Sequence, residues 1–310
     1  MFTRRTFIGS TLGAAATFVG AQTALPQGTH KRMIVDAQIH LWKAESEDWK
    51  WVPGMKPQQP EPFTIERALP LMDEGGVDRA VIVPPSWPGD RNDYALEAVK
   101  RYPGRFAVMG RIPLKDPNSA ALLSNWKAQP GMLGIRLTFL GPAAKWLDDG
   151  TADWFWPAAE KTGLPVMVLA PKRGAYLAGV AERHPQLQLI VDHMGMSLSD
   201  EAVSAGKFDG AIGDTATLAK FPNVSVKLSG AANFSKQPYP HADLNPHIKR
   251  LFEAFGPQRS YWGTDITNGV FTQVPYRQRI AHFTEALGFL TEDDKNWVMG
   301  RAILARLKWS

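Results

Sequence analysis

Residues 33–42 read MIVDAQIHLW, an apolar run that ends in polar residues. Side chains two positions apart lie on the same face of a β-strand. The segment therefore predicts a first strand that carries Asp36, Gln38 and His40 on one face near its C-terminal end. A single histidine at a strand end is more often a hydrogen-bonded packing residue. The segment thus indicates a functional site only if later strands bring partners to the same place.

Short apolar segments alternate with helical segments along the rest of the chain. Further strands are predicted at residues 79–84, 105–110, 132–138, 165–170, 187–192, 223–228 and 260–264. Helices are predicted at residues 64–76, 92–102, 119–129, 154–162, 175–183, 209–220, 245–255, 276–287 and 292–307. This alternation is typical of a parallel sheet, and eight such units predict an α/β protein with a (β/α)8 TIM barrel. A doubly wound sheet is the alternative, but no glycine-rich dinucleotide-binding or P-loop motif follows any strand.

Composition narrows the classes of function. The chain has 310 residues, of which 44% are hydrophobic and 21% charged, as expected for a globular protein. It contains no cysteine, so disulfides and thiolate chemistry are excluded and any metal would need His, Asp or Glu ligands. The net charge of +5 is modest and no basic cluster occurs, so nucleic acid is not an expected partner.

The N-terminus resembles a twin-arginine signal. Arg4 and Arg5 precede a stretch of small and apolar residues that ends near Ala21 or Ala24. We therefore expect residues 1–24 to be a signal peptide that sends the protein to the periplasm, and residues 33–310 to form the folded domain. The alternative is a chance arginine pair before a membrane anchor. The stretch is short and rich in Gly, Ala and Thr, so no stable membrane anchor is expected.

A long segment rich in tryptophan and proline follows the first strand, at residues 42–62. It is too long and too aromatic for a plain connection. Two interpretations are equally open: the segment covers the mouth of a pocket, or it is a surface loop held by its tryptophans.

The carboxyl ends of the strands meet at one face of a TIM barrel, and that face holds the active site. The polar residues expected there are Gln38 and His40 from the first strand, Arg136 from the fourth, His193 from the sixth, Lys227 from the seventh and Asp265 from the eighth. So many at the correct strand ends indicate a site rather than chance. Asp192 has the opposite strand parity to His193, which favours a supporting role. Arg136 and Lys227 could instead be structural ion-pair partners.

Four motifs resemble the amidohydrolase superfamily, in its amidohydrolase-related, lactonase-like branch. They are residues 36–42 (DAQIHLW), 192–195 (DHMG), 226–230 (VKLSG) and 263–265 (GTD). The resemblance extends from residue 33 to the C-terminus. It implies a metal-dependent-hydrolase-like TIM barrel. The branch includes pyrone-dicarboxylate lactonase and sugar-lactone hydrolases, and metal-dependent decarboxylases are more distant relatives.

One departure bears on the cofactor. The family begins with His-x-His, two metal ligands, but Gln38 stands at the first position here. The fifth strand ends at Ala170, which cannot bind a metal. His40, His193 and Asp265 remain available as ligands, and a catalytic zinc generally has three good ligands and a water. These residues would hold one metal weakly, and the lactonase-like branch that the chain resembles includes members that work without metal. We therefore favour no metal, with one zinc or other divalent ion as the alternative.

These features predict an exported hydrolase that opens a lactone or similar carboxylic ester. Asp265 is expected to be the general base that activates water, while His193 and His40 polarise the carbonyl or protonate the leaving oxygen. The alternatives are a metal-dependent decarboxylase of the same superfamily and a non-catalytic exported binding protein. Asp265 argues against the latter, since a pure binder has little use for it.

The substrate is expected to be a small molecule that carries a carboxylate. Arg136 and Lys227 would bind that carboxylate or the developing oxyanion. Gln38 and Trp42 complete the predicted substrate-binding residues.

Overall fold

The structure is a computed structural model that describes residues 31–269 and 273–310. Residues Arg32–Ser310 form one compact unit. The predicted signal peptide at residues 1–24 lies outside the described residues. In the part of the chain that is described, no helix has both the length and the apolar character needed to cross a membrane.

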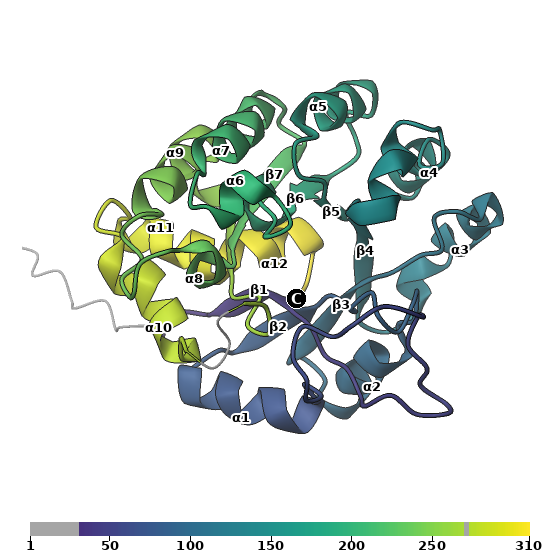
Figure 1. The fold of residues 1–310 in the computed structure, drawn as a ribbon, viewed down its shortest axis with the longest axis horizontal. Helices are drawn as coiled ribbons and strands as arrows, with labels where there is room; N and C mark the ends of the chain where they lie inside the picture. Colours follow the sequence, from purple (N-terminus) through teal and green to yellow (C-terminus); the bar gives the residue numbers. More distant parts are fainter. Residues whose placement is uncertain (1–30, 270–272) are drawn as a thin grey trace, which may run out of the picture. The chain divides into compact units, whose positions relative to one another are not determined.

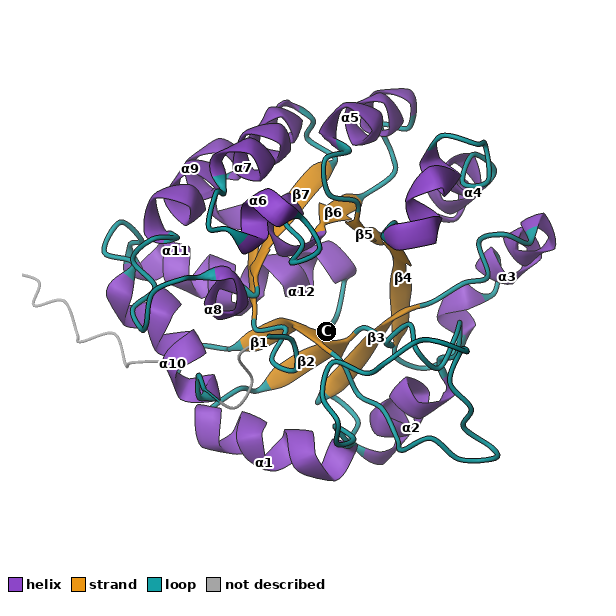
Figure 2. Cartoon of the chain, in the orientation of Figure 1, coloured by secondary structure: helices purple, strands orange, loops and turns teal. Residues whose placement is uncertain are grey.

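Eight parallel strands, paired in chain order, form a single sheet. They are β1 (Val35–Ile39), β2 (Arg79–Ile82), β3 (Phe106–Gly110), β4 (Met132–Thr138), β5 (Val166–Leu169), β6 (Leu189–Val191), β7 (Val224–Ser229) and β8 (Ser260–Gly263). Beyond β8, the Asp265 N–H donates to the Gln38 carbonyl at the end of β1 (2.9 Å), which brings the two edges together. Figures 1 and 2 show the strands as a ring with helices around it. The structure confirms the TIM barrel.

The helices that follow the strands lie around this ring, except the last, which lies within its outline in this view (Figure 1). They are α1 (Ile65–Gly75), α2 (Asp93–Arg101), α3 (Ala120–Leu123), α4 (Phe155–Thr162), α5 (Gly174–Arg183), α6 (Glu201–Ser204), α7 (Asp209–Ala216), α8 (Ala231–Phe234), α9 (Asn245–Phe255), α10 (Tyr276–Ala281), α11 (Glu292–Asn296) and α12 (Ala302–Leu307). Prediction missed the short α6 and α8. The helices predicted at 276–287 and 292–307 are each interrupted by a π-helical turn, at His282–Ala286 and Trp297–Arg301.

The predicted helix at residues 119–129 is wrong in its extent. α3 ends at Leu123, and a separate 3₁₀ turn covers Trp126–Ala128. The hydroxyl of Ser124 donates to the carbonyl of Ala121 (3.0 Å). Serine and asparagine side chains compete with helical hydrogen bonds in this way, which explains why the Ser124–Asn125 pair ends the helix.

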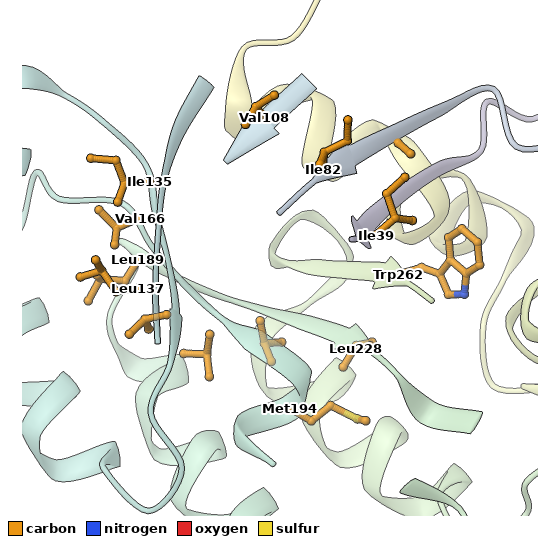
Figure 3. Packing of buried hydrophobic residues seen from close by; sticks show 14 of the residues in the cluster. Ile39, Ile82, Val108, Ile135, Leu137, Val166, Leu189, Met194, Leu228 and Trp262 are labelled. Carbon is orange, nitrogen blue, oxygen red and sulfur yellow. The ribbon is translucent and has the colours of Figure 1, made fainter. Parts of the chain in front are cut away.

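The buried apolar residues form two layers, as the alternation of side chains along barrel strands requires. An outer layer lies between the strands and the helices; Figure 3 shows Ile39, Ile82 and Val108 of this layer on neighbouring strands. An inner cluster includes Val81 and Met109, and α12 packs against it through residues such as Ile303. α12 therefore helps to fill the barrel interior, and the polar residues at the strand ends lie above this apolar filling.

Asp36 closes the barrel and does not face the site, which corrects the prediction that it shares a face with Gln38 and His40. The strand register shifts between Asp36 and Ile39, and this irregularity breaks the two-residue alternation. The buried Asp36 carboxylate accepts hydrogen bonds from the Thr264 N–H (2.8 Å), the Thr264 hydroxyl and the Tyr276 hydroxyl (2.6 Å). Asp36 thus joins β1 to the segment after β8 and to α10.

Candidate active site

A cavity of about 300 Å³ opens at the carboxyl ends of the strands. Residues from or just after β1, β2, β4, β5, β6 and β8 contribute to its wall. Its polar lining includes His40, Arg136, Thr138, His193, Asp265 and Asn268, and its apolar lining includes Trp87, Leu140, Leu169, Met196 and Phe234. The cavity is therefore the place where the strand-end residues predicted from the sequence can meet a ligand.

Volume alone does not select this cavity. A larger groove of about 680 Å³ lies against α6 and α7 and includes Lys172, Asp209 and His247. The Asp209 side chain is 91% exposed there. The strand-end cavity instead exposes titratable groups that the fold has largely removed from water, which is typical of catalytic sites.

Asp265, His40 and His193 meet at the base of the cavity, and we call them the catalytic cluster. The Nε2 atom of His40 lies 3.1 Å from Asp265 Oδ1, and the Nε2 atom of His193 lies 3.9 Å from Asp265 Oδ2. Asn268 donates its amide to Oδ2 (3.0 Å). Oδ1 accepts no well-aligned hydrogen bond, because His40 approaches it only within ion-pair distance. One carboxylate oxygen thus keeps a lone pair for a proton from a ligand.

The neighbours of His40 indicate which of its two ring nitrogens carries a hydrogen. Its Nδ1 atom lies 2.6 Å from the Val83 carbonyl, which can only accept, so Nδ1 carries a hydrogen. Its Nε2 atom also lies 3.2 Å from the amide nitrogen of Gln38. Unprotonated Nε2 accepts from that amide, and protonated Nε2 can donate to Asp265. His40 therefore exchanges protons with the cavity through a single atom.

Burial and neighbouring polar groups together set the charge states of the other two groups. Burial by itself raises the pKa of Asp265, but the His193 and His40 imidazoles and the Asn268 amide outweigh it and hold the pKa below its ordinary value. Burial lowers the pKa of His193 to about 4, although Asp265 and Asp192 oppose this. At neutral pH the cluster therefore combines an ionised carboxylate with a neutral His193 imidazole.

The backbone is unusual at the same strand ends. His193, Met194 and Asp265 adopt left-handed conformations, with φ of 51°, 60° and 48°. Non-glycine residues rarely adopt this conformation, and where they do the surrounding structure must hold them. The positive φ explains how His193 and Asp265 turn into the cavity immediately after β6 and β8.

Lys227, Asp192 and Gln38 lie below the cluster, and we call them the floor. Lys227 is fully buried. Its ammonium lies 2.7 Å from Asp192 Oδ1 and donates a hydrogen bond to the side-chain amide oxygen of Gln38. Neither Lys227 nor Gln38 lines the cavity. Both side chains are used within the floor, and their contact with substrate stays a prediction.

Arg136 connects the floor to the cavity. Its Nε donates to Asp192 Oδ2 (2.9 Å) and its Nη1 to the Thr138 hydroxyl. Burial raises the pKa of Asp192, but Lys227 and then Arg136 outweigh it and lower the pKa to about 2. Arg136 is only 7% exposed yet lines the cavity, so it serves both as an ion-pair partner and as a cation that a ligand can reach.

Trp42 is not a substrate-binding residue, because it is fully buried. Its ring packs edge-on against Trp87 (5.0 Å between ring centroids), and Trp87 lines the cavity 6.5 Å from the His40 ring. The tryptophan that lines the cavity is Trp87, which follows β2 where the apolar strand passes into residues 84–87 (PPSW). Phe234 of α8 was missed because its short helix was not predicted.

The segment at residues 42–62 reaches the cavity. Gln58 lines it, and the Thr267 hydroxyl after β8 donates to the Gln58 amide oxygen (2.6 Å). The amide of Gln59 donates to the Thr267 carbonyl (2.8 Å). The segment is also held by a tryptophan, since Trp49 is 7% exposed and packs edge-on against Tyr94, so each of the two interpretations describes part of it.

The residues at the base of the cavity do not fit a divalent metal. The Lys227 ammonium can only donate, so the Gln38 oxygen must face Lys227 and the Gln38 N–H group must face His40. That N–H group occupies the side of His40 Nε2 that a metal would need, and it repels a cation. Among the described residues, no three His, Asp or Glu side chains are arranged to hold a metal ion.

Comparison with known proteins identifies the family. The Amidohydrolase family profile matches residues 35–303. An L-fucono-1,5-lactonase from Burkholderia ambifaria is 28% identical over 236 residues, which covers 74% of this chain and 79% of that protein. A 4-sulfomuconolactone hydrolase from Hydrogenophaga intermedia is 27% identical over 227 residues, which covers 71% of this chain and 68% of that protein.

Solved structures share the fold. A probable 2-pyrone-4,6-dicarboxylic acid hydrolase from Acinetobacter baumannii, with citric acid bound, has a TM-score of 0.69 at 20% identity and covers 89% of this chain and 99% of its own. A zinc-bound amidohydrolase from Burkholderia multivorans has a TM-score of 0.69 at 19% identity, with the same coverage. A 5-carboxyvanillate decarboxylase from Sphingomonas paucimobilis has a TM-score of 0.64 at 17% identity and covers 90% and 100%. Given the profile match over nearly the whole barrel, this chain belongs to the amidohydrolase family of hydrolytic enzymes.

Proposed function

We propose that this hydrolase opens a lactone, or a similar carboxylic ester, by the attack of water with Asp265 as general base. One observation carries the proposal: Asp265 is buried and ionised and lines the cavity, and its Oδ1 atom has no aligned hydrogen-bond donor among the described residues. Two relatives with about 28% identity are named as enzymes that act on lactones, which supports the same class of substrate.

The reaction follows from the protonation states of the catalytic cluster. A water molecule between Asp265 Oδ1 and the ester carbonyl gives its proton to Asp265 as its oxygen attacks the carbonyl carbon. The neutral His193 imidazole donates a hydrogen bond to the carbonyl oxygen, where negative charge develops. The tetrahedral intermediate then expels the ring oxygen, which takes the proton that Asp265 received from water, passed on by His40 Nε2 (3.1 Å from Asp265 Oδ1), so that Asp265 is ionised again. The product is a hydroxy acid.

Arg136 supports a substrate that carries a carboxylate. Its guanidinium is a fixed cation in the cavity wall, and arginine binds carboxylates through paired hydrogen bonds. Lys227 acts only indirectly, because it balances the charge of Asp192 and leaves Arg136 in place.

The decarboxylase alternative has less support. The decarboxylase neighbour shares the fold at 17% identity, and the reaction expected for that branch requires a bound metal. The orientation of the Gln38 amide opposes metal binding at His40. No specific contact in the cavity favours decarboxylation over hydrolysis.

The proposal is tested on purified protein with a panel of five- and six-membered lactones and linear esters, before and after chelation. We expect hydrolysis of at least one lactone that survives chelation and is abolished in Asp265→Asn. If no member of the panel is hydrolysed, the hydrolase proposal fails and the non-catalytic binding protein becomes the better supported alternative. If decarboxylation appears and depends on added metal, the lyase alternative replaces the proposal.

We further propose that the protein is exported to the periplasm by the twin-arginine route, because Arg4 and Arg5 precede a short apolar stretch. In a bacterial host with this pathway, Arg4→Lys combined with Arg5→Lys should retain the precursor in the cytoplasm. Cell fractionation and immunoblotting measure this. Equal periplasmic accumulation of the double variant and the wild type would contradict the proposal.

A further inference from the structure

A second cavity of about 190 Å³ lies beside the catalytic one. The two cavities share three lining residues, Ser86, Arg136 and Thr138. The two cavities are therefore adjacent, with Arg136 in the wall of both.

Arg111 is the most informative residue of the side cavity. It follows β3 directly, and its backbone is fixed: its N–H donates to the Asn92 side-chain oxygen (2.7 Å) and its carbonyl accepts from the Asn92 amide (2.9 Å). The Arg111 Nε atom donates to Asp90 Oδ1 (3.2 Å), and the side chain is only 14% exposed. Its Nη1 atom is buried and has no hydrogen-bond partner among the described residues.

A buried guanidinium nitrogen without an acceptor is unfavourable, because desolvation is not compensated. Burial lowers the pKa of Arg111, and the nearby Arg136 lowers it further, although Asp90 opposes both effects. Arg136 already uses its Nε and Nη1 atoms on Asp192 and Thr138. Two guanidinium groups thus face one small space, in which Asp90 is the carboxylate lining the wall. An anionic ligand group would supply the missing acceptor.

We propose that the side cavity is an anion subsite in which Arg111, together with Arg136, binds a carboxylate or similar compact anionic substituent of the substrate. This deepens the proposed function and rests on it in one respect: it assigns the substrate class as acidic lactones rather than neutral ones. Val52, Leu114 and Trp146 make part of its wall apolar, which fits a short apolar arm that ends in the anion.

The first test compares two lactones that differ only in charge, δ-valerolactone and the same ring with a carboxylate substituent. Arg111→Gln removes the cation and retains much of the shape. We expect kcat/KM for the acidic lactone to fall about ten- to a hundredfold, as the loss of a charge-assisted hydrogen bond predicts, while the neutral lactone changes less than about twofold. Arg111→Lys keeps the charge without the planar fork, so it should recover part of the loss.

Arg91→Gln is the matched control. Arg91 is a partly exposed arginine that pairs with Asp93, lies over the Trp49 ring and lines neither cavity. Arg91→Gln should leave kcat/KM for both lactones unchanged. Thermal unfolding of all three variants verifies that they fold. Equal losses on the acidic and neutral lactones in Arg111→Gln, or no loss on either, would overturn the subsite.

A binding experiment separates the subsite from the proposed reaction. Glutarate carries two carboxylates and resembles an opened acidic lactone. Calorimetric titration should show that Arg111→Gln weakens glutarate binding at least tenfold, with Arg91→Gln unchanged. If no lactone is hydrolysed but this dependence is found, the subsite stands and the hydrolase proposal fails. If neutral lactones are hydrolysed and glutarate binding is independent of Arg111, the hydrolase proposal stands and the subsite fails.

Discussion

The floor and the catalytic cluster each bury an aspartate almost completely, Asp192 at 0% and Asp265 at 1% exposure, yet they differ in what surrounds the carboxylate. Each oxygen of Asp192 lies within 3 Å of a permanent cation, Lys227 or Arg136. Asp265 instead faces two imidazoles, which can lose their charge, and one of its oxygens accepts no aligned hydrogen bond. The first arrangement holds a charge in place, and the second leaves a carboxylate free to take a proton.

The largest expected effect separates the two regions by activity. Asp265→Asn nearly preserves shape but removes the proton acceptor, so kcat for lactone hydrolysis should fall about a hundred- to ten-thousandfold, the range for loss of a general base. The free energy of unfolding should change little. Steady-state kinetics and urea unfolding measure the two quantities. A variant that keeps most of its activity would reject Asp265 as the base.

The second prediction concerns the contribution of the floor to the free energy of unfolding. Asp192→Asn leaves Lys227 buried without its counter-ion, and removing one partner of a buried ion pair typically costs about 3–5 kcal/mol of unfolding free energy. Lys227→Met added to Asp192→Asn removes the stranded charge and should restore part of the loss. If both variants are as stable as the wild type, the floor is not a charge-balanced support.

The third prediction distinguishes the regions by pH. His193 has a pKa of about 4 when folded and about 6.5 when unfolded, so the unfolded chain binds more protons between these values. The free energy of unfolding should therefore fall as the pH drops from 6.5 to 4, by up to about 1.4 kcal/mol per pH unit for one such group. Burial lowers the pKa of His282 to about 4 as well, so His282 contributes in the same window.

The floor responds at lower pH. Asp192 has a pKa of about 2 when folded, below its ordinary value near 4, so its stabilisation is present above pH 4 and is lost toward pH 2. His193→Gln should reduce the slope between pH 6.5 and 4 and leave the lower window intact. Urea titrations across pH check this, and an unchanged upper slope would contradict the burial of neutral His193.

The smallest expected effect concerns Gln38, which joins the two regions. Gln38→His places an imidazole beside His40, so bound zinc, measured by elemental analysis, should rise above that of the wild type and of Gln38→Leu. Turnover should not depend on that metal. Near-stoichiometric zinc in the wild type, with activity lost on chelation and recovered on adding metal, would overturn the metal-free mechanism and make the decarboxylase alternative the stronger one.

Most of the fold can be predicted from the local pattern of apolar and polar residues, because that pattern marks the strands and the helices between them. β4 has the predicted bounds, Met132–Thr138. The failures occur where one local interaction overrides the pattern. The hydroxyl of Ser124 ends a helix early, and a register shift after Asp36 turns that carboxylate away from the site. Neither effect is visible in hydrophobic periodicity.

The sequence predicted which strand ends meet at the site, but not which side chains reach the cavity and which are buried below it. His40, His193 and Asp265 come together as the topology requires. Whether a strand-end cation faces ligand or is used by a buried partner depends on three-dimensional neighbours, which is why Lys227 and Arg136 appeared equivalent in sequence. Arg111 stands directly after β3, and the same reading of strand ends could have included it.

The hydrogen bonds by which Asp36 joins β1 to the segment after β8 have a consequence for biosynthesis. The partners of Asp36, Thr264 and Tyr276, lie 228 and 240 residues further along the chain. At ribosomal rates of about 5–20 residues per second, β1 waits on the order of ten seconds or more before its closing partners are made. During that time the buried carboxylate and the edge of β1 are unpaired. A chain cut short before residue 260 would therefore contain β1 to β7 and still lack β8 and a closed barrel.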